Sequence, residues 1–130
     1  MKYKRYCKTL LLKNDPQLIE DYKKVHAPGA AWPEIMQGMK EVGILDMEIY
    51  LDGNRLFMIM DTVADFDHEK AMAELATKPR QREWEAYVSR FQKTTEDASA
   101  DDKWQLMDRI FELDQKEVYP AIDGQQKEMK

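Results

Sequence analysis

The chain has 130 residues, of which 43% are apolar and 35% are charged, and its formal net charge is −5 at pH 7. This size and composition predict one globular domain with its own core, and the acidic balance argues against nucleic acid or an anionic membrane as partner. The lone cysteine, Cys7, cannot form an intrachain disulfide, and no apolar run is long enough for a signal peptide or a membrane span. We therefore expect a cytoplasmic protein.

The first strand and the first helix are predicted near the N-terminus. Residues 5–13 have the apolar character of a strand, and Asp15 followed by Pro16 is a typical helix start, with Asp as cap and Pro in the first turn. Apolar residues then recur at three- and four-residue spacing, which predicts an amphipathic helix. Tyr22 and His26 are four residues apart, so they project from the same face of this helix.

The next stretch contains a corner, a second helix and a hairpin. Pro28 and Gly29 end the first helix, and Pro33 predicts the first turn of a second helix that ends at Gly43. Asp52-Gly53 separates two apolar runs at residues 44–51 and 55–62, which is a strong signal for a β-hairpin.

The second half of the chain predicts helices over residues 65–77 and 80–91, and a polar loop over residues 93–102. Residues 104–113 predict a fourth strand, and residues 114–130 are expected to form a polar and flexible C-terminal tail. The domain is therefore expected to span residues 1–113.

The order strand, helix, two-stranded hairpin, helix, strand is the split βαβ or ferredoxin-like arrangement of an α+β protein. Residues 56–60 are continuously apolar, which favours a strand that is covered on both faces. One helical layer covers a single face, so a second subunit is expected on the other. The sequence thus predicts a homodimer in the form of a dimeric α+β barrel.

Several classes of site are excluded by the motifs that the sequence lacks. The five glycines are scattered and form no phosphate-binding loop, and neither serine lies in a nucleophile-elbow context. Two histidines without a spaced cluster of Cys, His or Asp predict no metal site. The functions that these absences leave open are acid–base catalysis and simple ligand binding.

Each candidate site residue has a structural and a functional interpretation. His26 is either a helix-end residue that bonds the last carbonyls or a general acid, because histidine titrates near neutral pH. Tyr22 is either a core-edge residue or a hydrogen-bonding group for a sugar hydroxyl. Trp32 and Trp84 are either core residues or stacking partners of a sugar ring, and the carboxylates that flank Trp84, including Glu83, are expected to be solvated.

Five short segments occur together in this order: Tyr22-x-x-x-His26, Trp32-Pro33-Glu34, Glu48-Ile49-Tyr50-Leu51, Asn54-Arg55-Leu56-Phe57 and Arg82-x-Trp84. Together they resemble the L-rhamnose mutarotase family, which also includes proteins that act on L-fucose. The resemblance covers roughly residues 5–113. It implies a dimeric α+β barrel that interconverts the α and β anomers of a 6-deoxy-hexose without a cofactor.

The resemblance also implies roles for individual residues. The proton-donor histidine of the family falls on His26, a sugar-contacting tyrosine on Tyr22 and a substrate-binding tryptophan on Trp84. Two positions depart from the family pattern: Glu83 replaces the first residue of a usual Trp-Trp pair, and Met47 replaces a substrate-contacting tyrosine. Both changes concern sugar contacts, so L-fucose is a serious alternative to L-rhamnose.

The catalytic base is left open, with Glu83 as a weak candidate for that role or for binding a sugar hydroxyl. Two other functions are also open. One is a haem-binding barrel with His26 as iron ligand, and the other is a sugar-binding dimer without catalysis. Both stay open because fold alone does not decide function.

Overall fold

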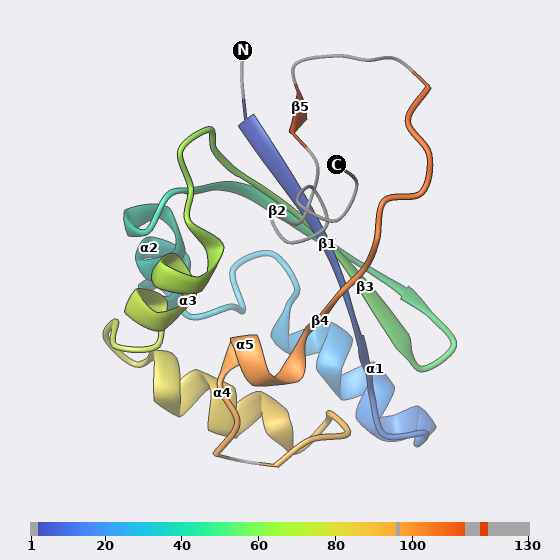
Figure 1. Cartoon of the computed structure of the whole chain (residues 1–130). Coiled ribbons are helices and arrows are strands. Elements are labelled where there is room, and N and C mark those ends of the chain that lie inside the picture. Colours follow the sequence, from blue (N-terminus) through green and yellow to red (C-terminus); the bar gives the residue numbers. More distant parts are fainter. Residues whose placement is uncertain (1–2, 96, 114–117, 120–130) are drawn as a thin grey trace.

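The computed structural model describes residues 3–95, 97–113 and 118–119 (Figure 1). The elements follow in this order: β1 (Tyr3–Leu11), α1 (Pro16–Val25), α2 (Pro33–Glu41), β2 (Ile44–Asp52), β3 (Arg55–Val63), α3 (His68–Leu75), α4 (Gln81–Ser89), α5 (Ala100–Lys103), β4 (Gln105–Leu106) and β5 (Val118–Tyr119).

The sheet has the strand order β2-β3-β1-β4, and each of these neighbouring pairs is antiparallel. The short strand β5 pairs with β1 in the parallel direction. The two central strands are therefore the first and third strands in the chain. A hairpin joins β2 to β3, and helical connections lead from β1 to β2 and from β3 to β4. This topology confirms the predicted ferredoxin-like α+β fold.

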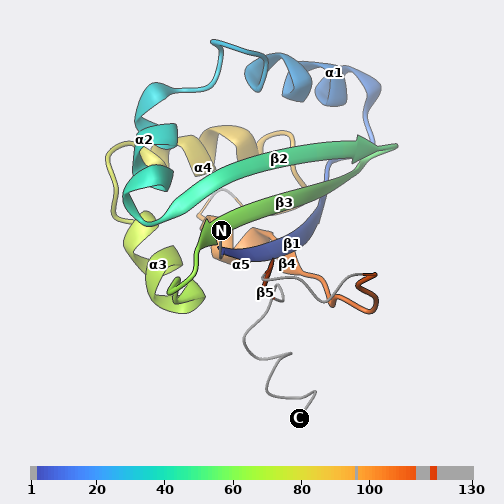
Figure 2. The ribbon, with the colours of Figure 1, turned by 90° about the horizontal axis from the view of Figure 1, so that it is seen from above.

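One face of the sheet carries the helices α1, α2 and α4, as the view from above shows (Figure 2). Successive side chains of a strand point to opposite faces of the sheet, so burial alternates along the strands. In β3, Leu56, Met58 and Met60 are buried, whereas Phe57 and Ile59 between them are only half-buried. Among the described residues, α1, α2 and α4 all lie on one face of the sheet, and the second covering layer predicted for β3 stays a prediction.

Local sequence signals explain most element boundaries. Asp15 caps α1 by accepting hydrogen bonds from the backbone N–H groups of Gln17 and Leu18 at 2.9 and 3.1 Å. Pro33 occupies the first turn of α2, as predicted. The β2–β3 turn places Gly53 at φ +64°, a left-handed conformation that glycine adopts without a steric penalty.

The end of the domain differs from the prediction. The polar stretch expected to be a loop contains α5, because Ser99 and Asp102 form a reciprocal capping box. The predicted strand over residues 104–113 is reduced to the two residues of β4. Beyond it the apolar side chains do not alternate toward the core: Ile110 and Phe111 are 95% and 74% exposed. Of the predicted tail only β5 is described, and residues 114–117 and 120–130 lie outside the described residues.

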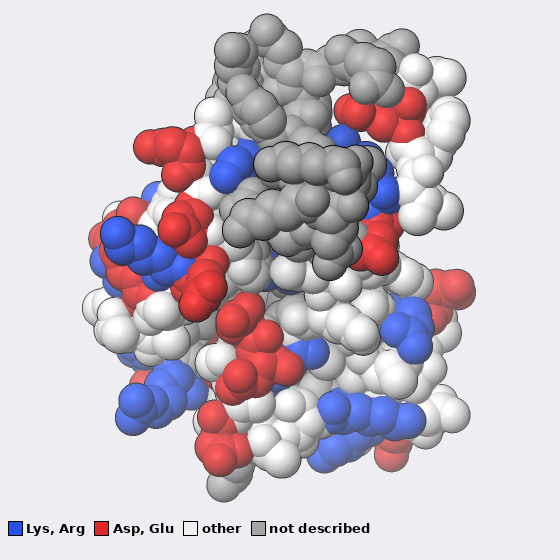
Figure 3. Space-filling model, viewed as in Figure 1, with Lys and Arg blue, Asp and Glu red and all other residues white. Residues whose placement is uncertain are grey.

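Acidic and basic side chains are interspersed over the face seen in Figure 3. Within the described part of the chain, no helix has both the length and the apolar composition that a membrane crossing requires.

Candidate active site

A cavity of about 330 Å³ lies on the helix-covered face of the sheet. Its lining combines methionine and isoleucine side chains of α2, β2 and β3 with a polar group drawn from β1, α1 and α4. This composition, mainly apolar with a few polar groups, is typical of a small-molecule site. The cavity brings together four of the predicted site residues: Tyr22, His26, Met47 and Trp84.

His26 is held by the helix that it ends. It is the C-terminal cap of α1, and its ring nitrogen Nδ1 lies 2.9 Å from the backbone carbonyl oxygen of Tyr22. A carbonyl only accepts, so Nδ1 carries the proton and Nε2 of the neutral ring has a free lone pair. Burial lowers the pKa of His26, and the bond to Tyr22 opposes this shift only in part. The uncharged imidazole, with a basic Nε2, is therefore favoured at neutral pH.

Tyr22 lies directly beside this imidazole, with ring centroids 4.2 Å apart. Its hydroxyl oxygen accepts a hydrogen bond from Nε2 of Gln92 at 3.4 Å, which leaves the hydroxyl proton available to a ligand. Burial raises the pKa of Tyr22, so the phenol stays protonated. The Oε1 atom of Gln92 is buried and has no hydrogen-bond partner among the described residues, although Gln92 lines the cavity. A ligand hydroxyl would satisfy that acceptor.

Two tryptophans, Trp84 and Trp104, line the cavity. Trp84 is buried and meets His26 edge to face at 5.5 Å between ring centroids. Trp32 contacts Trp84 at 5.1 Å but does not line the cavity. Instead it stacks on Tyr87, and the guanidinium of Arg80 lies 4.0 Å from the centre of its ring. Trp32 thus supports the wall from behind.

Glu83 is placed outside the cavity. Its carboxylate accepts two hydrogen bonds from the Arg80 guanidinium, and its side chain is 61% exposed. This residue belongs to the outer surface of α4, whereas the next carboxylate on the helix, Glu85, points inward and lines the cavity.

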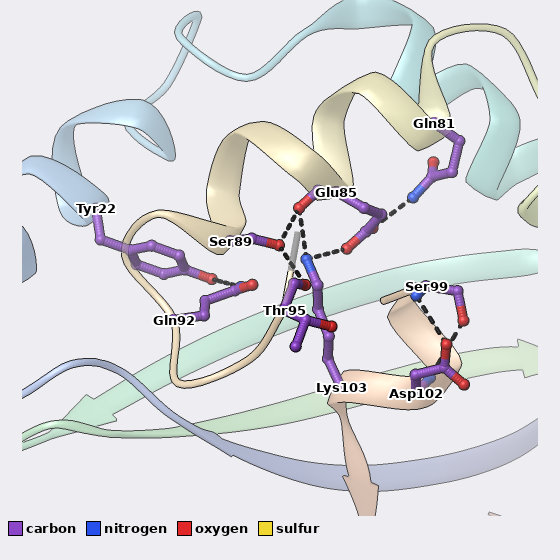
Figure 4. A network of polar contacts seen from close by, with 9 residues as sticks. All are labelled: Tyr22, Gln81, Glu85, Ser89, Gln92, Thr95, Ser99, Asp102 and Lys103. Atoms are coloured by element: carbon purple, nitrogen blue, oxygen red, sulfur yellow. Dashed lines mark hydrogen bonds and ion pairs between the residues drawn. The ribbon is translucent and has the colours of Figure 1, made fainter. Parts of the chain in front are cut away.

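A buried polar network surrounds Glu85 (Figure 4). Its Oε1 atom accepts from Nζ of Lys103 at 2.9 Å, and its Oε2 atom accepts from Nε2 of Gln81 at 2.6 Å. The same lysine also donates to the backbone carbonyl of Glu85 at 2.7 Å, and Ser89 donates to that carbonyl at 2.6 Å. Both carboxylate oxygens are therefore already engaged as acceptors, and the charge of Glu85 is paired with that of Lys103.

Three polar lining residues were missed by sequence reasoning: Lys8, Glu85 and Gln92. A signal existed for Lys8, because Tyr6, Lys8 and Leu10 alternate along one strand and must share a face. A signal also existed for Glu85, since Gln81, Glu85 and Ser89 follow at four-residue spacing. Charge alone had led us to expect a solvated glutamate there.

A second cavity of about 180 Å³ lies next to the first and shares Glu85 with it. It has none of the aromatic groups or the histidine of the larger cavity. No group of three or more Cys, His, Asp or Glu side chains suited to a metal ion occurs among the residues that the structure describes.

Comparison with known proteins identifies the family of this chain. The sequence model of the L-rhamnose mutarotase family matches residues 5–113. The chain is 37% identical over 113 residues to an L-fucose mutarotase of Xanthomonas campestris pv. campestris, which covers 87% of this chain and 90% of that protein. It is 31% identical over 83 residues to an L-rhamnose mutarotase of Sinorhizobium fredii, which covers 64% of this chain and 76% of that protein.

A solved structure supports the fold independently. The crystal structure of an L-rhamnose mutarotase from Formosa agariphila superposes with a TM-score of 0.58 over 85% of this chain and 98% of that chain, at 18% sequence identity. At this level of identity the likeness concerns the fold alone. The match of the family model and the identity to the Xanthomonas protein together show that the chain belongs to the L-rhamnose mutarotase family.

Proposed function

We propose that the protein interconverts the α and β anomers of a 6-deoxy-hexose, with L-fucose as the first sugar to consider and L-rhamnose as the second. The observation that carries the proposal is the neutral His26 ring, fixed by its bond to the Tyr22 carbonyl, in a cavity that also holds a phenol and an indole face. Mutarotation needs proton transfer and sugar binding but no redox chemistry, and these residues supply both.

In the proposed mechanism each of these residues has a step. Trp84 offers an apolar face for the sugar ring, and the hydroxyl of Tyr22 donates a hydrogen bond to a sugar oxygen. His26 takes the proton of the anomeric hydroxyl on Nε2 while the ring oxygen is protonated, so the ring opens to the aldehyde. After rotation about the C1–C2 bond, the imidazolium returns its proton as the ring closes. The sequence predicted His26 as the acid of ring opening, whereas in this proposal it is the base of that step and donates its proton only when the ring closes. General acid–base catalysis of this kind contributes about 10²–10⁴-fold.

We place L-fucose before L-rhamnose as the candidate substrate because of the comparisons with known proteins. The relative named as an L-fucose mutarotase is 37% identical over most of both chains, whereas the relative named as an L-rhamnose mutarotase is 31% identical over a shorter stretch. The family match gives no support to the haem-binding alternative. Binding without catalysis is distinguished from mutarotation by the experiment below.

Exchange NMR on the anomeric protons tests the activity directly, with L-fucose, L-rhamnose and other aldoses at equilibrium. We expect faster exchange with one or both 6-deoxy sugars and loss of the acceleration in His26→Gln. His68→Gln is the matched control, because the other histidine of the sequence lies at the start of α3 and does not line the cavity. A wild-type protein that binds sugar without changing the exchange rate would overturn the proposal.

The proposal includes a homodimer in the cytoplasm. Three large apolar side chains after β4 are strongly exposed in the single chain: Ile110, Phe111 and Leu113. Apolar groups gathered this way are usually covered by a partner. Sedimentation should give twice the chain mass, and a Phe111→Ser/Leu113→Ser variant should be monomeric. The lone cysteine, Cys7, supports a reducing compartment.

A further inference from the structure

Lys8 is a buried amine that the steps above do not use. It lies on the central strand β1, and its backbone partners are Met58 on one side and Leu106 on the other. Its exposed fraction is 1%, yet it lines the same cavity as His26. The side chain therefore reaches the cavity floor through an apolar part of the sheet.

No described residue makes a hydrogen bond or an ion pair with the Lys8 amine. The ionisable groups around it on the neighbouring elements are Tyr22 and His26 of α1, Glu85 of α4, and Asp101 and Lys103 of α5. Among these, Glu85 and Lys103 already bond each other, and Asp101 acts on Lys8 only at a distance through its charge. Natural proteins rarely bury a lysine without a partner, so the amine is expected to meet one in the ligand.

Ring opening requires a proton at the ring oxygen while His26 removes one from the anomeric hydroxyl. The Tyr22 phenol is a weak acid whose pKa burial raises further. Both oxygens of Glu85 already accept hydrogen bonds. An ammonium group, in contrast, has three protons to give.

We infer that Lys8 is the second proton-transfer residue of the site, which protonates the ring oxygen of the sugar while His26 accepts the anomeric proton. The inference rests on the proposed mutarotase function and adds to it a partner that the family resemblance did not provide. Glu83, the weak candidate for the catalytic base, is bonded to Arg80 outside the cavity.

The step balances without any other reagent. The O1–H proton moves to Nε2 of His26, the C1–O5 bond breaks, and a proton moves from Nζ of Lys8 to O5. The product is the open-chain aldehyde with a free hydroxyl at O5. After rotation about C1–C2, O5 attacks the other face of C1, its proton returns to Lys8, and His26 returns its proton to O1. Both residues end in their starting forms.

The protonation states agree with this division of roles. Burial lowers the pKa of Lys8 to about 8, and the nearby charge of Asp101 opposes the shift. The amine is thus mostly an ammonium at neutral pH and gives up its proton easily, while His26 is mostly neutral. Two groups whose environments place them on opposite sides of neutrality form an acid and a base at the same pH.

The test is the pH profile of anomer exchange in wild type, Lys8→Met and Lys8→Arg. We expect the wild-type acceleration to fall as the pH rises through about 8, because the ammonium is lost. Lys8→Met should lose about 10²-fold or more of the acceleration. Lys8→Arg should lose a similar amount, because guanidinium keeps the charge but does not release a proton.

The controls separate a folding defect from a chemical one. Met fits the apolar neighbours of Lys8, so Lys8→Met should keep the thermal midpoint of the wild type. Lys13→Met removes an exposed lysine just after β1 and should not change the exchange rate. Full activity of Lys8→Met or Lys8→Arg in an active wild-type background overturns the Lys8 inference alone. A wild type that accelerates exchange of no aldose overturns the proposed function and this inference together.

Discussion

The backbone of Tyr22 holds the side chain of His26: the carbonyl oxygen of the first accepts from Nδ1 of the second at 2.9 Å, while the two rings lie 4.2 Å apart. The orientation of the imidazole therefore does not depend on the phenol hydroxyl. The sugar binding proposed for Tyr22 and the proton transfer proposed for His26 can thus be separated by mutation.

Tyr22→Phe removes the hydroxyl and keeps both the carbonyl and the ring contact. We expect the KM for the sugar to rise by about tenfold, which corresponds to the loss of one hydrogen bond, with kcat changed by a small factor. Nε2 of Gln92 loses its partner, so the free energy of unfolding should fall by about 1 kcal/mol. Exchange rates against sugar concentration and a urea titration measure both. A loss of kcat as large as that in His26→Gln would instead make the hydroxyl a proton-transfer group.

The acid side of the pH profile should report His26. Its pKa is lowered from the ordinary 6.5 by burial, and in the proposed mechanism the neutral ring is the base that starts the reaction. Activity should therefore stay high as the pH falls to 6.5 and should decline only below that value, when Nε2 becomes protonated. Anomer exchange measured between pH 4.5 and 7.5 tests this. A decline centred above pH 6.5 would contradict the assigned cause.

Removal of one partner of the Lys103–Glu85 ion pair should lower the free energy of unfolding strongly. The two side chains are 0% and 10% exposed, so Lys103→Met leaves a buried carboxylate without its cation. We expect a loss of about 3–5 kcal/mol in the free energy of unfolding. Lys103→Met combined with Glu85→Gln should lose less than the sum of the single variants, as measured by chemical denaturation. Additive losses would show that the two residues do not stabilise each other.

Substitution of Gly43 and Gly53 by alanine separates the cost of backbone strain from the cost of a steric clash. Both have positive φ, at +103° and +64°. A Cβ at Gly53 meets no atom within 4 Å, so Gly53→Ala should lose about 1–2 kcal/mol from the left-handed conformation alone. At Gly43 a Cβ would lie 3.1 Å from Cγ2 of Val63, so Gly43→Ala should lose more. Thermal unfolding of the two variants measures both losses of stability, and equal losses would contradict the expected clash at Gly43.

Much of the fold was predictable because its signals are local. Asp15, Pro33 and Gly53 each act on neighbouring backbone, and each marks an element boundary found in the structure. The end of the domain was less predictable. Residues 110 and 111 are apolar, but their exposure depends on which surfaces lie nearby, and periodicity contains no information about that.

The site was predictable on α1 and only partly elsewhere. Tyr22 and His26 share a helix face, so their spacing already places them together. The inward direction of Glu85 and the outward direction of Glu83 depend on how α4 packs against the sheet, which neighbouring charges in the sequence do not reveal. The lysine on β1 was missed as a site residue, because lysines are rarely buried and its charge did not point to the cavity.

The pairing of Lys8 with Leu106 joins positions close to opposite ends of the described chain. During synthesis on the ribosome, one edge of β1 has no strand to bond until β4 has been made. An unpaired edge on a central strand can recruit strands of other nascent chains, and contacts between distant residues form slowly. Strand β1 therefore depends on β4, which is made late, to protect this edge, and a prematurely terminated product would be prone to aggregate even though it contains His26 and Tyr22.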